Sequence, residues 1–181
     1  RMLASVIALH GDDKGLVFPF NIAPAQVIVV PISLEKNVVE KCREVEKNLK
    51  EKCRVKVDLS ENTPGWKFNQ WEMRGVPIRI EVGPKEIMAR EVTLSRRDTG
   101  ERQSVKEKDL QSHIGKIGDS MTKRLALNAD NWFSKNMHSA KSIKDLEGLG
   151  GKGGFIKASF CSIETAGKKC SDRIKDKLHL H

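Results

Sequence analysis

From residue 26 onward, strand-like and helix-like spacings of apolar residues alternate, and this alternation constrains the fold more than any other feature. Residues 27–32 are continuously apolar, as expected of a strand that is covered on both faces. The order of the segments predicts an α/β fold with a largely parallel sheet and helices on its faces. The segments are a strand at 27–32, a helix at 35–52, a strand at 54–59, a helix at 64–74 that ends at Gly75 and a strand at 76–82.

The next part of the chain predicts how the sheet ends. Gly83-Pro84 indicates a turn, and residues 91–96 alternate like a further strand. A short last strand at 102–105 pairs with it through the turn at 98–100. This hairpin makes the sheet mixed rather than fully parallel. Residues 109–136 then predict one long amphipathic helix.

Composition shifts predict three segments, at residues 1–23, 24–147 and 148–181. Two prolines between residues 19 and 24 indicate a linker, and the piece before it is too small to fold alone. The second shift is a run with five glycines at 148–154. A strand after this run and a polar, partly helical stretch at 162–177 complete the predicted tail.

The charge balance favours a polyanionic partner. The chain has 33 Lys and Arg against 24 Asp and Glu, a net charge of +9 over 181 residues; such an excess is typical of nucleic-acid binding. No apolar run approaches the ~20 residues of a membrane span. Four cysteines without a recognisable signal peptide predict a reducing, cytoplasmic compartment. The absence of Tyr, with few Trp and Phe, argues against an aromatic stacking platform.

Motifs of metal binding, phosphate binding and nucleophilic catalysis are weak. Cys42 and Cys53 are interpreted as core thiols. Cys161 and Cys170 are separated by eight residues, which is wider than the usual spacing of zinc ligands. The glycine run lacks the order of a P-loop and is interpreted as a flexible connector. No Ser/His/Asp set is recognisable.

The most informative stretch is 65–102. Phe68 and Glu72 share a helix face, and Arg79 shares a strand face with Glu81. Lys85 and Glu86 follow at the carboxyl end of that strand, where open α/β sheets bind ligands. An aromatic ring, acids and cations together suit an unpaired guanine. The alternative is a surface lattice of salt bridges among Glu72, Arg79, Glu81 and Lys85.

Residues 65–86, GWKFNQWEMRGVPIRIEVGPKE, resemble prolyl-tRNA synthetase of the archaeal and eukaryotic-like type, as do residues 10–17, HGDDKGLV. The resemblance covers about residues 1–160. It implies a cytoplasmic, homodimeric class II enzyme that uses ATP with Mg to join L-proline to tRNA-Pro. It assigns 1–23 to the end of the catalytic domain, 24–147 to an anticodon-binding domain with a mixed five-stranded sheet flanked by helices, and 148–181 to a zinc-domain-like tail.

The resemblance also implies roles for individual residues. Phe68 would stack on an anticodon base. Glu72, Arg79, Lys85 and Glu86 would bond the two guanines of the UGG anticodon, and Arg102 would contact the RNA from the next hairpin. Arg1 stands where the family has the motif 3 arginine that binds ATP. Cys161 and Cys170 stand where the family has two close pairs of zinc-binding cysteines, and the second pair is missing.

Motifs 1 and 2 are absent from these 181 residues, so this stretch alone should not aminoacylate. Two other functions stay open from the residues themselves. One is a freestanding RNA-binding or regulatory module with no attached enzyme. The other is a small-molecule site at the carboxyl end of the sheet, built from the same polar residues.

Overall fold

The computed structural model describes residues 2–150, 152–159 and 165–178. Contacts between residues divide the chain into two compact units, Arg1–Ala126 and Leu127–His181. The helix α5 (Leu110–Lys135) carries the chain from the first unit into the second. The first 23 residues therefore belong to the same compact unit as the sheet.

The first unit contains the predicted sequence of strands and helices. Its strands are β1 (Val27–Pro31), β2 (Val55–Val57), β3 (Ile78–Val82), β4 (Glu91–Arg96) and β5 (Arg102–Lys106). Besides α5, its helical segments are α1 (Met2–His10), η1 (Phe20–Ile22), α2 (Lys36–Leu49), α3 (Pro64–Met73), α4 (Pro84–Ala89) and η2 (Glu107–Asp109).

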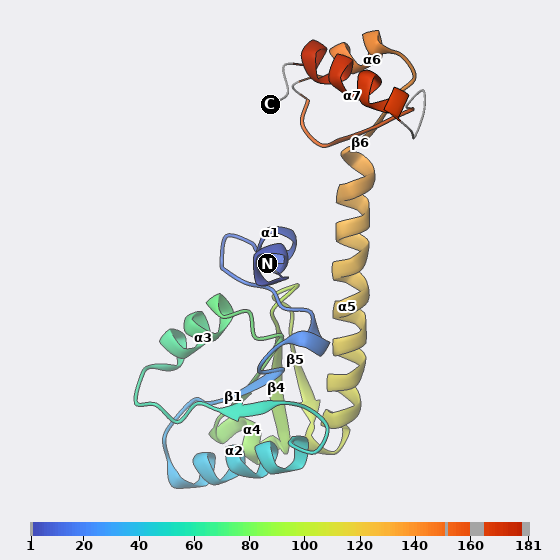
Figure 1. Cartoon of the computed structure of the whole chain (residues 1–181). Coiled ribbons are helices and arrows are strands. Elements are labelled where there is room, and N and C mark those ends of the chain that lie inside the picture. Colours follow the sequence, from blue (N-terminus) through green and yellow to red (C-terminus); the bar gives the residue numbers. More distant parts are fainter. Residues whose placement is uncertain (1, 151, 160–164, 179–181) are drawn as a thin grey trace. The chain divides into compact units, whose positions relative to one another are not determined.

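The five strands form one mixed sheet in the order β2-β1-β3-β4-β5 (Figure 1). β1 lies between β2 and β3 and is parallel to both, and Val29 is opposite Val57 and Ile80. β4 is antiparallel to β3 and to β5. The predicted fold class is therefore confirmed, including the hairpin that makes the sheet mixed.

One face of the sheet carries the main apolar core. Valine, isoleucine and leucine side chains of β1, β3, β4 and β5 pack there against α2 and the first half of α5. The middle of α5 approaches the linker closely, because a Cβ at Gly118 would lie 2.5 Å from the ring of Phe20. Gly118 thus allows Phe20 to pack directly on the helix, which joins the 16–22 segment to the sheet unit.

The opposite face is apolar over β1 and polar further along. Phe68 and Trp71 of α3 pack on Ile28 and Val30 of β1, and Figure 1 shows α3 apart from α2 and α4. Alternation along β3 then places Arg79 on this polar part, since its neighbours Ile78 and Ile80 belong to the main core.

One element in this region departs from prediction. Gly83 and Pro84 do not form a simple turn: Gly83 is the N-cap of α4, and Pro84 occupies its first turn. Proline suits that position because its missing N–H has no partner there in any helix. α4 ends at Ala89, and its C-cap Arg90 has φ 54°.

After α5, the described residues of the second unit form a two-stranded parallel sheet and two helices. Its elements after α5 are β6 (Met137–Ala140), α6 (Ile143–Leu149), β7 (Phe155–Ala158) and α7 (Thr165–Leu178). A strand was expected after the glycine run, and β7 lies there. β6 and α6 were not expected; α6 begins with a capping box in which Ser142 and Asp145 bond each other's backbone.

Candidate nucleic-acid interface

Arg79 lies at the junction between α3 and the polar part of the sheet. Its guanidinium carbon is 4.1 Å from the centre of the Phe68 ring, a separation at which a cation is attracted to an aromatic face. Phe68 itself is half-buried, because its helix packs on the apolar part of β1. The predicted aromatic and the predicted cation are therefore brought together, with the arginine stacked on the ring.

Glu81 links two arginines across the sheet. Its Oε1 accepts from Nε of Arg79 at 3.1 Å, and its Oε2 accepts from the guanidinium of Arg102. Arg79 also donates to Oγ of Ser95 at 3.3 Å. The strand register explains this row, because Ser95 of β4 is opposite both Arg79 and Arg102. Three strands thus contribute to one charged cluster, Arg79–Glu81–Arg102.

The other predicted residues lie around this cluster with different partners. Glu72 pairs with Nζ of Lys14 at 3.6 Å, and Glu86 accepts from Oγ1 of Thr93 at 3.5 Å. Lys85 is exposed on α4. The alternative salt-bridge lattice therefore forms in part. Arg79 and Glu81 pair as that alternative requires, but Glu81 also pairs with Arg102, and Glu72 pairs with Lys14 instead.

The sequence did not indicate two residues of this region as site residues: Glu81, and Ser95, which accepts from Arg79. A signal for Glu81 exists, since it is two residues from Arg79 on an alternating strand and must share its face. Ser95 could be found only from the register of the hairpin. Local spacing does not predict the pairing of Glu81 with Arg102 or the contact of Lys14 with Glu72.

The space enclosed beside Arg79 is too small for a ligand. Side chains of α3, β3 and β4 surround a cavity of about 10 Å³, next to Glu72 and Arg79. That volume holds about one water molecule. A base or nucleotide must therefore contact these residues from the surface of the sheet.

Arg97 ties residues 10–15 to the edge of the same site. Its guanidinium donates to both carboxylate oxygens of Asp12, at 2.8 and 2.5 Å, and to the carbonyl of Glu72 at 2.9 Å. The Arg97 side chain is 3% exposed. This hydrogen bonding holds the pKa of Asp12 below its usual value, although burial opposes the shift. The HGDDKG segment therefore has a structural partner in the sheet.

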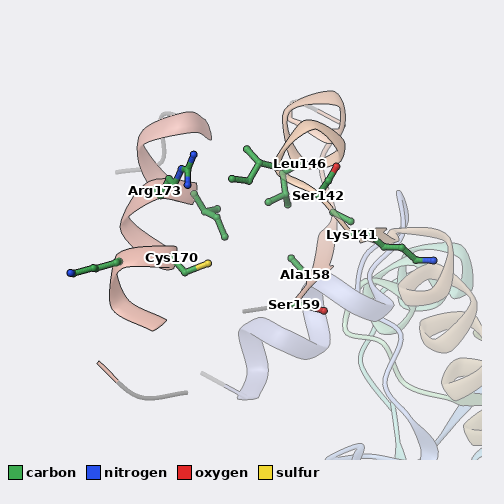
Figure 2. Close-up of a pocket in the computed structure, with 11 residues that line it drawn as sticks. Lys141, Ser142, Leu146, Ala158, Ser159, Cys170 and Arg173 are labelled. Carbon is green, nitrogen blue, oxygen red and sulfur yellow. The ribbon is translucent and has the colours of Figure 1, made fainter. Parts of the chain in front are cut away.

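Two of the predicted residues for ATP and zinc, Arg1 and Cys161, lie outside the described residues. Cys170 of α7 lines a cavity of about 410 Å³ in the second unit, together with Ser142, Leu146 and Arg173; Figure 2 shows its sulfur directed into this space. Among the described residues, no group of three His, Cys, Asp or Glu side chains could hold a metal. Because Cys161 lies outside the described residues, the zinc site at Cys161 and Cys170 stays a prediction.

Two further expectations concern the membrane and the glycine run. Within the described part of the chain, no helix is both long and apolar enough to cross a membrane. Gly148 lies within α6, and Gly153 and Gly154, both at positive φ, lie between α6 and β7. This helix–loop–strand order is the reverse of a P-loop, which connects a strand to a helix.

Comparison with known proteins gives one matching domain family and many relatives. Residues 26–117, from the start of the sheet into α5, match the family described as "Anticodon binding domain". Similar proteins include the proline–tRNA ligases of Thermofilum pendens, 41% identical over 182 residues, and Lachnoclostridium phytofermentans, 41% identical over 179 residues. Proline–tRNA ligase 2 of Bacillus cereus is 38% identical over 180 residues.

These alignments include 97 or 98% of this chain, whereas the chain spans only 36 or 37% of the length of these relatives. The matched family covers the whole five-stranded sheet and the cluster built on it. The resemblance seen in residues 65–86 is thereby confirmed: the chain belongs to the anticodon binding domain family and is similar over nearly its full length to proline–tRNA ligases.

Proposed function

We propose that this chain recognises the anticodon of tRNA-Pro as part of a prolyl-tRNA synthetase. The intact enzyme would join L-proline to this tRNA with ATP and Mg, in a homodimer, at a catalytic site built outside these 181 residues. The observation that carries the proposal is the family match over residues 26–117, which contains every residue of the Arg79–Glu81–Arg102 cluster. The net charge of +9 supports a polyanionic partner.

The cluster supplies the donors for a guanine. Arg102 is 57% exposed and Arg79 is 16% exposed, so both guanidinium groups can be reached from the surface of the sheet. A guanidinium that donates to O6 and N7 is the commonest specific contact to guanine. The Arg79 guanidinium, stacked on the Phe68 ring, offers a flat surface on which an unpaired base can stack.

Acceptors for the guanine N1–H and N2–H₂ come from other acids. Both carboxylate oxygens of Glu81 are already engaged by arginines. Glu72 and Glu86 each hold a single weak partner, at 3.6 and 3.5 Å, so they keep free acceptor capacity. We therefore assign base contacts to Glu72 and Glu86, and a positioning role to Glu81. Lys85, exposed on α4, would add a donor at the same edge.

The test is binding of tRNA-Pro transcripts that carry either UGG or a scrambled anticodon. Arg79→Ala should weaken binding of the UGG transcript by about 1–3 kcal/mol, or roughly five- to 150-fold, with a smaller loss for the scrambled transcript. Arg43→Ala is the matched control, because Arg43 is an exposed arginine on α2, which covers the other face of the sheet.

An equal loss for both transcripts would reassign Arg79 to phosphate binding or to structure. Because Arg79 also pairs with Glu81, its variant is compared with wild type by urea unfolding. Arg102→Ala provides a second test, since that side chain is more exposed and its loss opens less of the interior. A wild-type chain that binds both transcripts equally would overturn the proposal itself.

A further inference from the structure

A basic hollow lies at the carboxyl edge of the sheet, outside the cluster already described. It has a volume of about 410 Å³ and is lined by Ala89, Arg90, Lys106, Glu107 and Lys108. The three cations come from the end of α4, the end of β5 and the short turn η2. Nothing in the proposed base recognition uses them.

The backbone fixes these cations around one space. Arg90 is the only described non-glycine residue with positive φ, at 54°, and its carbonyl accepts from the N–H of Glu107 at 3.3 Å. Lys106 is paired with Glu91, the residue after Arg90, in the β4–β5 ladder. The ends of α4 and β5 are therefore joined, and the side chains of Arg90 and Lys106 line the same hollow.

The hollow is more positive than its composition suggests. Glu107 is its single acidic lining residue, and Oε2 of Glu107 accepts from Nζ of Lys41 at 2.7 Å. Lys41 is the largely buried partner, with a side chain that is 18% exposed. Nζ of Lys41 also lies 3.0 Å from Oε2 of Glu44, so Lys41 offsets only part of the charge of Glu107. Arg90, Lys106 and Lys108 are exposed, and none of them forms a salt bridge within the described residues.

Three cations without carboxylate partners favour an anion with several acceptor oxygens. Phosphate is such a group: Arg binds it through a planar fork and Lys as a point charge. Alternation along β5 places Lys106 on the same face as Ser104 and Arg102. At ~3.3 Å a residue, about 13 Å of strand separates Lys106 from Arg102, so one strand of RNA that follows β5 reaches both.

We propose that Arg90, Lys106 and Lys108 form a phosphate-binding site for the backbone of the RNA whose bases contact Phe68, Arg79 and Arg102. This inference rests on the proposed anticodon recognition and adds to it the path of the RNA over the sheet. Phosphate contacts fix register and orientation, whereas base contacts carry the sequence information. Substitutions in the two sets of residues should therefore change RNA binding in different ways.

The experiment compares wild type with the triple variant Arg90→Gln, Lys106→Gln, Lys108→Gln. Affinity for UGG and scrambled tRNA-Pro transcripts is measured over a range of salt concentrations. The triple substitution should weaken binding of both transcripts by the same factor. The slope of log K against log salt should become shallower by about 2, since each of the three phosphate contacts to single-stranded RNA contributes roughly 0.7. The control replaces Lys36, Arg43 and Lys47 on α2 by Gln, which removes the same charge elsewhere.

Each outcome decides the matter. An unchanged salt slope, or the same flattening in the control, overturns the phosphate site. A loss confined to the UGG transcript overturns it too, because that is the signature of base contacts. Loss of ATP binding in the triple variant, with RNA binding intact, would assign the hollow to a small molecule instead.

The wild-type data separate this inference from the proposed function. If wild type does not distinguish the two transcripts, anticodon recognition fails whatever the triple variant does. If wild type distinguishes them and the triple variant behaves like wild type, only the phosphate site fails. Urea midpoints of all three proteins show whether the sheet unit remains folded. In an otherwise wild-type chain, Lys106→Arg with Lys108→Arg should leave the salt slope at its wild-type value.

Discussion

The contact between Asp12 and Arg97 makes a prediction about how residues 10–15 are held on the sheet unit. Asp12→Asn removes the negative charge but keeps the size of the side chain and one acceptor oxygen. Arg97, 3% exposed, is then left buried with one of its two bonds to residue 12 lost. A hydrogen bond to a charged group contributes about 1.5–3 kcal/mol.

Solvent access reduces this figure. The Asp12 side chain is 47% exposed, so water competes for the same donors. A fully buried ion pair that loses one partner costs about 3–5 kcal/mol, and that value is an upper bound here. We expect Asp12→Asn to lower the free energy of unfolding of the first unit by about 2 kcal/mol. Asp13→Asn is the matched control, because Asp13 is an exposed neighbour.

The assay is urea unfolding at pH 7, followed by tryptophan fluorescence. In a Trp132→Phe background the signal comes from Trp66 and Trp71, which both lie in the first unit. The urea midpoint should fall for Asp12→Asn and stay unchanged for Asp13→Asn. Equal midpoints for the two variants would refute the view that this ion pair stabilises the unit.

The pH dependence provides an independent check of the same reasoning. The hydrogen bond from Arg97 lowers the pKa of Asp12 in the folded state. A carboxylate with a lowered folded pKa contributes stability above its unfolded pKa, near 3.8, and loses it as the pH falls through the folded value. The difference between Asp12→Asn and Asp13→Asn should therefore shrink below pH 4. A difference that persists at lower pH would point to packing rather than charge.

Two further predictions concern stability and reactivity. Gly75→Ala should lower the free energy of unfolding more than Gly100→Ala does. Both residues have left-handed φ near 72°, which costs a non-glycine residue about 1–2 kcal/mol, but only at Gly75 would a new Cβ lie 2.7–2.8 Å from atoms of Leu16. Equal urea midpoints for the two variants would contradict this. Burial raises the pKa of Cys42 to about 12, so the native chain at pH 8 should leave Cys42 unlabelled by iodoacetamide until urea unfolds the first unit, as followed by peptide mass spectrometry.

Much of the sheet unit could be predicted because its residues obey the strand and helix periods. Val27, Val29, Ile78 and Ile80 all belong to the main core, as continuous or alternating apolar strands require. The predicted helix at 64–74 is confirmed, and at its start Oγ1 of Thr63 accepts from the N–H of Trp66. Local chemistry and burial agree in this region, so reading the sequence was sufficient.

The elements that were missed are short and have little apolar periodicity. α4 has six residues, too few for a helical repeat to stand out, and its Gly-Pro start is equally typical of a turn. β6 has four residues, MHSA, directly after the long α5. Among the described strands it pairs with β7 alone, so its existence depends on a pairing across the whole of α6 and the glycine run. A non-local pairing of this kind leaves no mark in a local window of sequence.

The sequence named the candidate site residues one by one but not as a network, and in the proposed function this network would decide how RNA approaches. The side chains of Glu81, Arg79 and Arg102 are 4%, 16% and 57% exposed, a gradient that runs from the interior of the sheet to its surface. In the proposed function, an incoming base would meet Arg102 first and would reach Phe68 only over, or in place of, the Arg79 guanidinium. Because Glu81 holds both arginines from below, it limits their side-chain freedom before RNA arrives and so lowers the entropy lost on binding. The partial salt-bridge lattice is therefore compatible with the proposed recognition surface, because the buried carboxylate of Glu81 orients the more exposed guanidinium groups of Arg79 and Arg102.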